Sequence, residues 1–151
     1  MIPLPALLAP LVAQSALILF DEFHFHRRRG LPRWERVGHP LDTATLIAGI
    51  AFTLWVPFSI AAAVVFAGLA IFSCAFVTKD EWVHAERCQG GEHWVHAMLF
   101  IAHPLVFLSV GWMWSQGIDP VFRNVPLALM LLFFLYQTVY WNFIDGKRSD
   151  Q

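Results

Sequence analysis

The stretch from Leu41 to Thr78, LDTATLIAGIAFTLWVPFSIAAAVVFAGLAIFSCAFVT, contains one charged residue, Asp42, and is otherwise apolar or weakly polar. A helix needs about 20 apolar residues to cross the hydrocarbon core of a bilayer. The stretch is too long to cross once and just long enough to cross twice. Pro57 lies near its middle, and proline starts a helix more readily than it continues one. The sequence therefore predicts two spans here, at about 41–56 and 58–84.

Three more apolar blocks flank this stretch, and they predict spans at about 4–25, 92–115 and 120–144. The whole chain is 58% hydrophobic and 14% charged, whereas about 25% of the residues of a soluble domain are charged. We therefore predict an all-α fold, a small polytopic transmembrane helical bundle of about five spans. It forms a single integral membrane domain over residues 1–151. A re-entrant segment at 41–56, which leaves four full spans, is the alternative.

The distribution of charge predicts the orientation of the bundle. With five spans, residues 21–41, 79–93 and 145–151 share one side of the membrane. Nine of the ten basic residues fall on that side, and Arg123 is the exception. The positive-inside rule places this side in the cytoplasm, with the N-terminus outside and the C-terminus cytoplasmic. We expect a bacterial inner membrane protein. A net charge of −1 gives no basic face for nucleic acid.

Carboxylates and histidines gather on the same side as the basic residues. Ten of eleven carboxylates and six of seven histidines lie in these segments or at the span ends beside them, and many are spaced three or four residues apart, which places them on one face of a helix. The pairs are Glu22 with His26, Asp21 with His24, His39 with Asp42, Glu81 with His84, Glu92 with His96, and His93 with His96. Each of four predicted helix ends thus offers a carboxylate and an imidazole.

Such a set is typical of a dinuclear metal site in a helical bundle, which takes about four carboxylates and two or more histidines. The ligand types are similar to those of ferritin-like carboxylate bundles, although the order of motifs along the chain differs. Carboxylate and imidazole suit iron, manganese or zinc. We expect two divalent metal ions, and iron is favoured because thiolates are few. The candidate ligands are Glu22, His26, Glu81, His84, Glu92 and His96, followed by His93 and Asp42.

A simpler interpretation is that the acids neutralise the Arg27–Arg29 run at the membrane surface. On this interpretation His24 and His39 are loop residues and Glu35 is a surface acid. His103 lies in the middle of a span, either as a neutral histidine bonded to a neighbouring helix or as a ligand or proton relay. Tyr140 and Asn142 are the expected hydrogen-bond partners of the ligands, and anchoring at the membrane interface is the alternative for Tyr140.

The favoured function is a membrane-embedded metalloprotein, a metal-dependent oxidoreductase acting on a hydrophobic small molecule or lipid. A zinc-dependent membrane hydrolase is the first alternative. A metal or proton transporter would need polar residues across the bilayer, and no acid lies near the middle of a predicted span. A non-catalytic membrane subunit that binds a partner through its arginine-rich loop is the third alternative. The pattern is compatible with a homo-oligomer.

Overall fold

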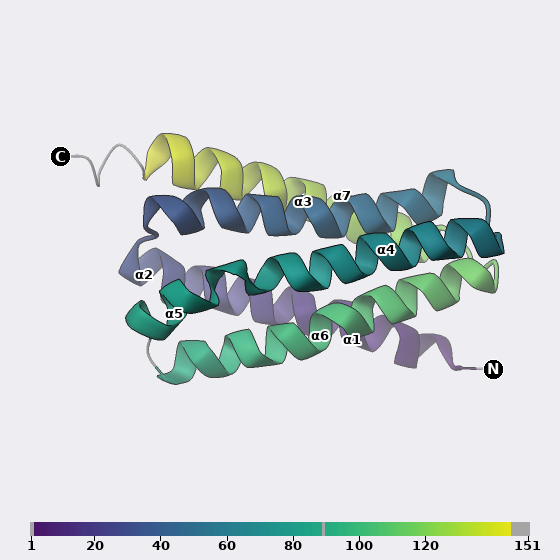
Figure 1. Ribbon diagram of the computed structural model, residues 1–151, viewed down its shortest axis with the longest axis horizontal. Coiled ribbons are helices and arrows are strands. Elements are labelled where there is room, and N and C mark those ends of the chain that lie inside the picture. The colour runs from purple at the N-terminus through teal and green to yellow at the C-terminus, as the bar shows by residue number, and fades with distance from the viewer. Residues whose placement is uncertain (1, 89, 146–151) are drawn as a thin grey trace.

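The computed structural model describes residues 2–88 and 90–145, and every regular element in these ranges is a helix. The elements form five rods that run side by side (Figure 1). Lys147 and Arg148, which we counted on the cytoplasmic side, lie outside the described residues.

Three of the five rods change their helical geometry near one end of the bundle. The first rod is α1 (Leu4–Phe20), the π-helical turn η1 (Asp21–His26) and α2 (Arg27–Arg29). The second is α3 (Arg33–Trp55). The third is α4 (Ile60–Phe76), the 3₁₀ turn η2 (Val77–Asp80) and α5 (Glu81–Arg87). The fourth is α6 (Gly90–Ser115), and the fifth is α7 (Val121–Val139) with the π-helical turn η3 (Tyr140–Ile144).

All five rods are long and apolar enough to cross a membrane, which confirms the all-helical class and the number of such helices. The segment expected at 41–56 begins earlier, at Arg33, and runs without a break to Trp55. At 1.5 Å per residue its 23 residues extend about 34 Å. The short second span and its re-entrant alternative are thus replaced by one full-length helix.

The breaks between the rods follow local chemistry. Pro57 lies in the connection after α3, and Ser59 then caps α4 by accepting a hydrogen bond from the backbone nitrogen of Ala62 at 3.1 Å. Gly30 has a φ of +74° between α2 and α3, a conformation that L side chains rarely adopt. This glycine turns the chain so that α3 begins beside the end of the first rod.

The rods pack as neighbours in a consistent pattern. α1 packs on α6, α7 packs on α3, and α4 packs on both α3 and α6. Small residues allow close approach, as at Gly49, where an added Cβ would lie 2.4 Å from the ring of Phe107. Ile50, Val110 and Met113 are fully buried between these helices.

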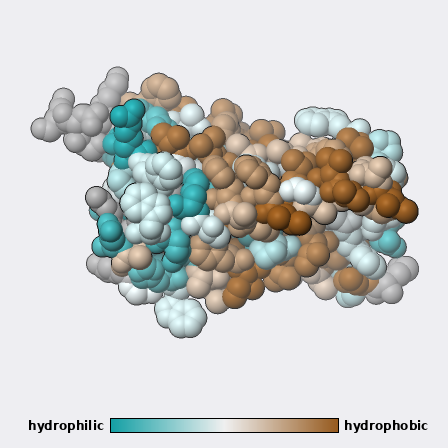
Figure 2. Space-filling model, in the orientation of Figure 1, coloured by the Kyte–Doolittle hydropathy of each residue, from teal (hydrophilic) through white to brown (hydrophobic). Residues whose placement is uncertain are grey.

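Polar side chains concentrate at one end of the bundle. We call this the polar end and define it as residues 21–41, 79–88, 90–93 and 140–145. Figure 2 shows hydrophilic residues over this end and a broad hydrophobic zone along the middle of the molecule. The N-terminal end of α1 lies at the opposite end of the bundle (Figure 1), which we call the far end.

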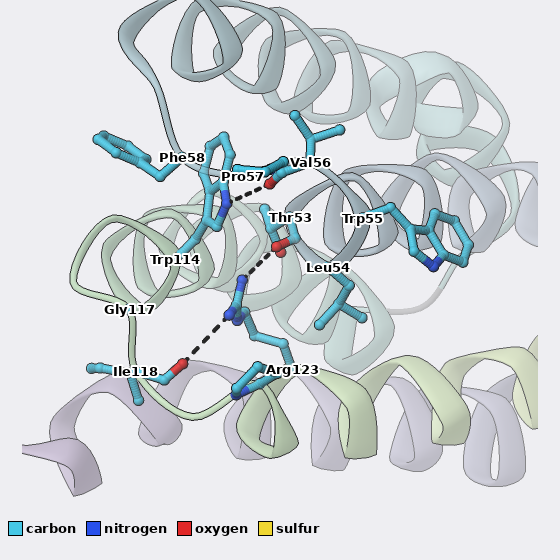
Figure 3. Close-up of a pocket in the computed structure, with 11 residues that line it drawn as sticks. Thr53, Leu54, Trp55, Val56, Pro57, Phe58, Trp114, Gly117, Ile118 and Arg123 are labelled. Carbon is cyan, nitrogen blue, oxygen red and sulfur yellow. Dashed lines mark hydrogen bonds between the residues drawn. The ribbon is translucent and has the colours of Figure 1, made fainter.

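Arg123, the one basic residue outside the predicted cytoplasmic segments, has a structural role at the far end. Its side chain is only 4% exposed and donates hydrogen bonds to the carbonyl oxygens of Thr53 at 2.6 Å and Ile118 at 3.4 Å (Figure 3). Thr53 lies in the last turn of α3, where carbonyl oxygens carry partial negative charge. Trp114 reinforces the same corner by donating to the carbonyl of Val56 at 2.9 Å. The arginine thus ties α7 to the end of α3.

Candidate metal centre

The π-helical turn η1 decides how the first rod presents its ionisable groups. Asp21, Glu22 and His26 are all buried within this turn. In an α-helix, residues five apart are about 140° apart around the axis. The wider π turn, in which hydrogen bonds join residues five apart, brings Asp21 and His26 to one face. Their Oδ2 and Nε2 atoms lie 3.2 Å apart.

α6 supplies a second pair to the same place. Glu92 lies in its first turn, where the helix dipole favours a carboxylate, and His96 follows four residues later on the same face. His96 Nε2 lies 3.2 Å from Asp21 Oδ2, and Glu92 Oε1 lies 3.6 Å from His26 Nε2. Ligand atoms of Asp21, His26, Glu92 and His96 all lie within 4.8 Å of one another. We call these four residues group A.

A second group with no member in common lies beside the first. Glu35 and His39 are four apart on α3, and His84 on α5 faces them. Ligand atoms of these three residues also lie within 4.8 Å of one another. We call them group B. With metal–ligand distances of about 2.0–2.2 Å, ligands on opposite sides of one ion are about 4.0–4.4 Å apart. Each group is therefore close to the dimensions of a single-ion site.

The four imidazoles of the two groups form a closed ring of neighbours. The ring centroids of His26 and His39 are 4.7 Å apart, and those of His84 and His96 are 4.1 Å apart. The other two sides, His39 to His84 and His26 to His96, measure 6.4 and 6.1 Å. The two short sides each join one histidine of group A to one of group B. Groups A and B are thus in direct contact.

Many of these buried polar atoms have no hydrogen-bond partner. The unpaired atoms are both ring nitrogens of His26 and of His84, His96 Nδ1, His39 Nε2, Asp21 Oδ1, Glu22 Oε2 and Glu35 Oε1. His26 Nε2 is within ion-pair distance of Asp21 but is not aligned for a hydrogen bond. Buried polar groups in proteins are normally paired, and unpaired ones gathered in one place suggest an ion or water that binds there.

Arg29 pairs with two of the carboxylates in this cluster. Its Nη2 lies 2.9 Å from Glu35 Oε2 and 2.9 Å from Glu92 Oε1, and it thus links group A to group B. Four carboxylates are buried here, those of Asp21, Glu22, Glu35 and Glu92. The buried carboxylates thus outnumber the one guanidinium that pairs with them. The expected neutralisation of acids by the Arg27–Arg29 run therefore accounts for only part of the cluster.

Glu22 has a different position from the other carboxylates. Its Oε1 accepts hydrogen bonds from Trp141 Nε1 at 2.7 Å and from the Tyr136 hydroxyl at 2.9 Å. Its Oε2 lies 3.7 Å from His26 Nδ1, on the side of the imidazole opposite to Nε2. A carboxylate in this position orients a ligating histidine and sets its tautomer. The structure therefore favours Glu22 as a support for His26 rather than as a ligand.

Three other predicted ligands do not join either group. Glu81 is three residues before His84, which turns it about 60° away on α5, and its side chain is 53% exposed. His93 is half-buried, about 100° around α6 from Glu92. Both oxygens of Asp42 accept hydrogen bonds from Lys79 Nζ at 2.7 Å. Of the eight predicted ligands, the structure brings together Glu22, His26, His84, Glu92 and His96.

Three residues were assigned differently from the sequence. Glu35, expected on the surface, is fully buried at 0% exposure, so that expectation was wrong. His39, expected in a loop, lies inside α3 and belongs to group B. Asp21 was paired with His24, because the spacing was interpreted as α-helical. His24 instead stacks on Phe20, with ring centroids 4.8 Å apart. The four-residue spacing of Glu35 and His39 is the sequence signal that could have identified group B.

The expected partners from the last rod were also incorrect. Tyr140 lies under the guanidinium of Arg27, 4.6 Å from ring centroid to Cζ. Asn142 donates to the backbone carbonyls of Arg36 and Thr138. Glu22 accepts hydrogen bonds instead from Tyr136 in the last turn of α7 and from Trp141 in the π turn η3.

Cys88 lies close to both groups, and its sulfur forms a third set of possible ligands with His84 and His96. Burial, reinforced by the nearby Glu92 carboxylate, raises the pKa of this thiol to about 12. The thiolate is the form that binds metals. Cys88 is therefore protonated at neutral pH unless a metal displaces its proton.

His103 ties helices together in the middle of the bundle. Gln14 Nε2 donates to His103 Nδ1 at 3.1 Å, so Nε2 carries the proton and donates to Ser73 Oγ at 2.9 Å. Ser73 Oγ lies 2.7 Å from Thr45 Oγ1, which donates to the Asp42 carbonyl. This series of hydrogen bonds connects α1 through α6 and α4 to α3. This geometry matches a neutral histidine bonded to neighbouring helices.

No protein-family model, curated protein or solved structure matches this chain. Its function must therefore be argued from the cluster itself.

Proposed function

We propose that this protein is a membrane-embedded metalloprotein with a dinuclear site, in which groups A and B each hold one ion. The observation that carries the proposal is the pairing of two adjacent ligand groups with no member in common, each with its ligand atoms within 4.8 Å. Two-metal sites hold their ions about 3.5–4 Å apart. Contacts of 4.1 and 4.7 Å between imidazole rings of the two groups support such a spacing.

The charge of the buried cluster also favours two bound cations over an empty site. Isolated buried carboxylates are strongly unfavourable, and those that are not paired normally take up protons or bind a metal. Two divalent ions would offset the excess of buried carboxylates over the single guanidinium of Arg29. They would also provide partners for the unpaired nitrogens of His26 and His84.

Iron is the metal that we favour, since the two groups contain imidazole and carboxylate ligands and no thiolate. A redox-active iron pair would supply oxidative chemistry, and we infer an oxidoreductase that acts on a lipid-soluble substrate. In this role His26, His39, His84 and His96 hold the ions. Glu22 fixes the orientation of His26, and Arg29 holds Glu35 and Glu92 in place.

A zinc-dependent hydrolase is the second candidate, and the set of His84, Cys88 and His96 favours it. Two imidazoles and a thiolate are zinc ligands, and zinc lowers the pKa of a bound water enough to generate a nucleophile. Cys88 belongs to neither group A nor group B, which weighs against this candidate.

We place the protein in a membrane with the cluster at the cytoplasmic face. Five helices have the required length and apolar character. Large apolar side chains such as Ile71, Ile101 and Leu132 are exposed near the middle of their rods, as expected for surfaces that face lipid. Of the basic residues that the structure describes, all but Arg123 lie at the polar end, and the positive-inside rule assigns such an end to the cytoplasm. A bacterial inner membrane fits this arrangement.

Elemental analysis of the chelator-washed protein, with the absorption spectrum of the same sample, tests this function. We expect iron at about two ions per chain, accompanied by absorption above the protein band. The double variant His26→Gln/His84→Gln should lose the metal, while the control His24→Gln should keep it. Stoichiometric zinc without such absorption would favour the hydrolase. Absence of bound metal in the unaltered protein would reject both functions.

A further inference from the structure

A cavity of about 990 Å³ runs along the bundle from the candidate metal centre towards the far end. At one end it is lined by Asp21, His26, His84 and His96. Beyond them its walls are mainly apolar, with Leu8 and Leu11 from α1 and Phe122 from α7 near the far end. The volume is at the upper end of the range for small-molecule sites, about 300–1,000 Å³. The cavity thus connects the candidate centre with the apolar middle of the bundle.

The cavity lies between two rods that do not pack closely on each other. α1 packs on α6 and α7 packs on α3, while few residues of α1 and α7 lie close to each other. Near the polar end they are joined by the hydrogen bonds of Tyr136 and Trp141 to Glu22. Val12 on α1 and Val125 and Leu129 on α7 line the cavity and are also exposed. The cavity is therefore a cleft that opens sideways, towards the lipid if the rods cross a membrane.

The cleft is as long as a lipid tail. Its lining on α1 extends from Leu8 to Asp21, a helical rise of about 20 Å. One leaflet of the hydrocarbon core is about 15 Å thick, half of the full core. An extended chain from a membrane lipid would therefore reach from the far part of the cleft to the metal ligands.

Physical chemistry excludes an empty cleft and disfavours a wet one. An unfilled space of this size would leave its apolar lining without packing contacts, which is unfavourable. Water needs polar partners, and apolar cavities stay dry. In the part of the lining nearer the far end, Gln14, Ser15 and His103 supply the polar groups among the described residues, and His103 is already bonded on both nitrogens. Hydrocarbon is the matching occupant.

We propose that this cleft binds one long single-chain lipid, a fatty-acyl or prenyl chain that enters from the bilayer between α1 and α7. Its polar end lies at the candidate metal centre and its tail extends towards Phe122. The inference rests on the proposed function for the role of the polar end, and it specifies the substrate class of that site.

The test is photo-cross-linking of palmitic acid that carries a diazirine in its tail, with the full chain in phosphatidylcholine nanodiscs. Mapping by mass spectrometry should find the label on the cleft-lining faces of α1 and α7. Ala16 lines the cleft, whereas Ala13 on the same helix is exposed but does not. In the variant Ala16→Phe, labelling should fall to the level of a non-irradiated sample. In Ala13→Phe, labelling should be unchanged.

A second pair of variants provides the same test if Ala16→Phe does not fold. Val125→Phe narrows the cleft from α7, and Leu132→Phe is its control, because Leu132 is exposed outside the cleft. Label distributed evenly over the exposed faces of all rods, or equal labelling of each variant and its control, would overturn the proposal. Label concentrated where Leu132 lies, as in a contact between copies, would also overturn it.

Metal content measured on the same samples separates this proposal from the proposed function. If the protein binds metal but Ala16→Phe does not change the labelling, the lipid cleft is rejected and the metal site is retained. Labelling that Ala16→Phe abolishes, in a chain without metal, supports a lipid cleft and rejects the dinuclear function.

Discussion

His39 and His24 are both histidines near the polar end, yet only His39 belongs to a ligand group. Replacing His39 by glutamine leaves Glu35 and His84 as the remaining ligands of group B. Loss of even an outer hydrogen-bond partner commonly weakens metal binding about 10–100-fold. We expect H39Q to retain about one ion per chain after chelator washing, and H24Q to retain the full content. Equal metal content in the two purified variants would remove His39 from the site.

The hydrogen bond from Trp141 to Glu22 gives a second prediction for a single residue. Its donor and acceptor are buried, and hydrogen bonds to charged groups contribute about 1.5–3 kcal/mol. Trp141→Phe should lower the free energy of unfolding in detergent by about this amount and also weaken metal binding. Trp94→Phe is the control, since Trp94 is exposed. If both variants unfold alike, the bond is not a support for His26.

Part of the cluster could be predicted from the sequence because its spacing is regular. Glu92 and His96 are four apart on an ordinary α-helix, and the structure places both in group A. Asp21 and His26 could not be paired in this way, because a π turn joins residues five apart. Glu35 and His39 have the right spacing, but their burial depends on the turn at Gly30, which the sequence pattern does not specify.

Close packing between helices leads to a prediction about glycines. An added Cβ at Gly49 would lie 2.4 Å from the ring of Phe107, whereas nothing lies within 4 Å at Gly68. Both alanine variants share the gain in helix propensity of about 1 kcal/mol. Gly49→Ala also pays an overpacking cost of about 1–3 kcal/mol. We expect the melting temperature in detergent to be lower for G49A than for G68A. The reverse order would show that α3 and α6 are less closely packed than described.

The number of long helices could be predicted because hydrophobic length and Pro57 determine it. The beginning of α3 could not, because Arg33–Pro40 is too polar to be recognised as part of an apolar span. The sequence also does not predict which face of the third rod each residue after η2 occupies, because this 3₁₀ turn rotates the residues that follow it around the helix axis. His84 is consequently buried, while Glu81 faces outward.

The orientation of the whole molecule can be tested with two exposed positions at opposite ends. Arg33 begins α3 at the polar end, and Ser59 lies at the far end before α4. If the polar end is cytoplasmic, an impermeant maleimide should label Ser59→Cys in intact cells. Arg33→Cys should react only after the cells are opened, and the unaltered protein measures background from Cys74 and Cys88. Labelling of Arg33→Cys in intact cells would invert the orientation.

At the scale of the whole molecule, the gathering of polar groups at one end could be predicted from charge and hydropathy. Two features could not, because they depend on which rods are neighbours. One is the contact between group A and group B, which brings α3 and α5 against η1 and α6. The other is the cleft between α1 and α7.

The central claim is that two metal ions lie among the four histidines. Diffraction data from the metal-loaded protein, collected at the iron absorption edge, test it most directly. We predict two anomalous peaks about 3.5–4 Å apart, one beside His26 and His96 and the other beside His39 and His84. No peak within this ring of imidazoles, or peaks elsewhere on the protein, would contradict the account.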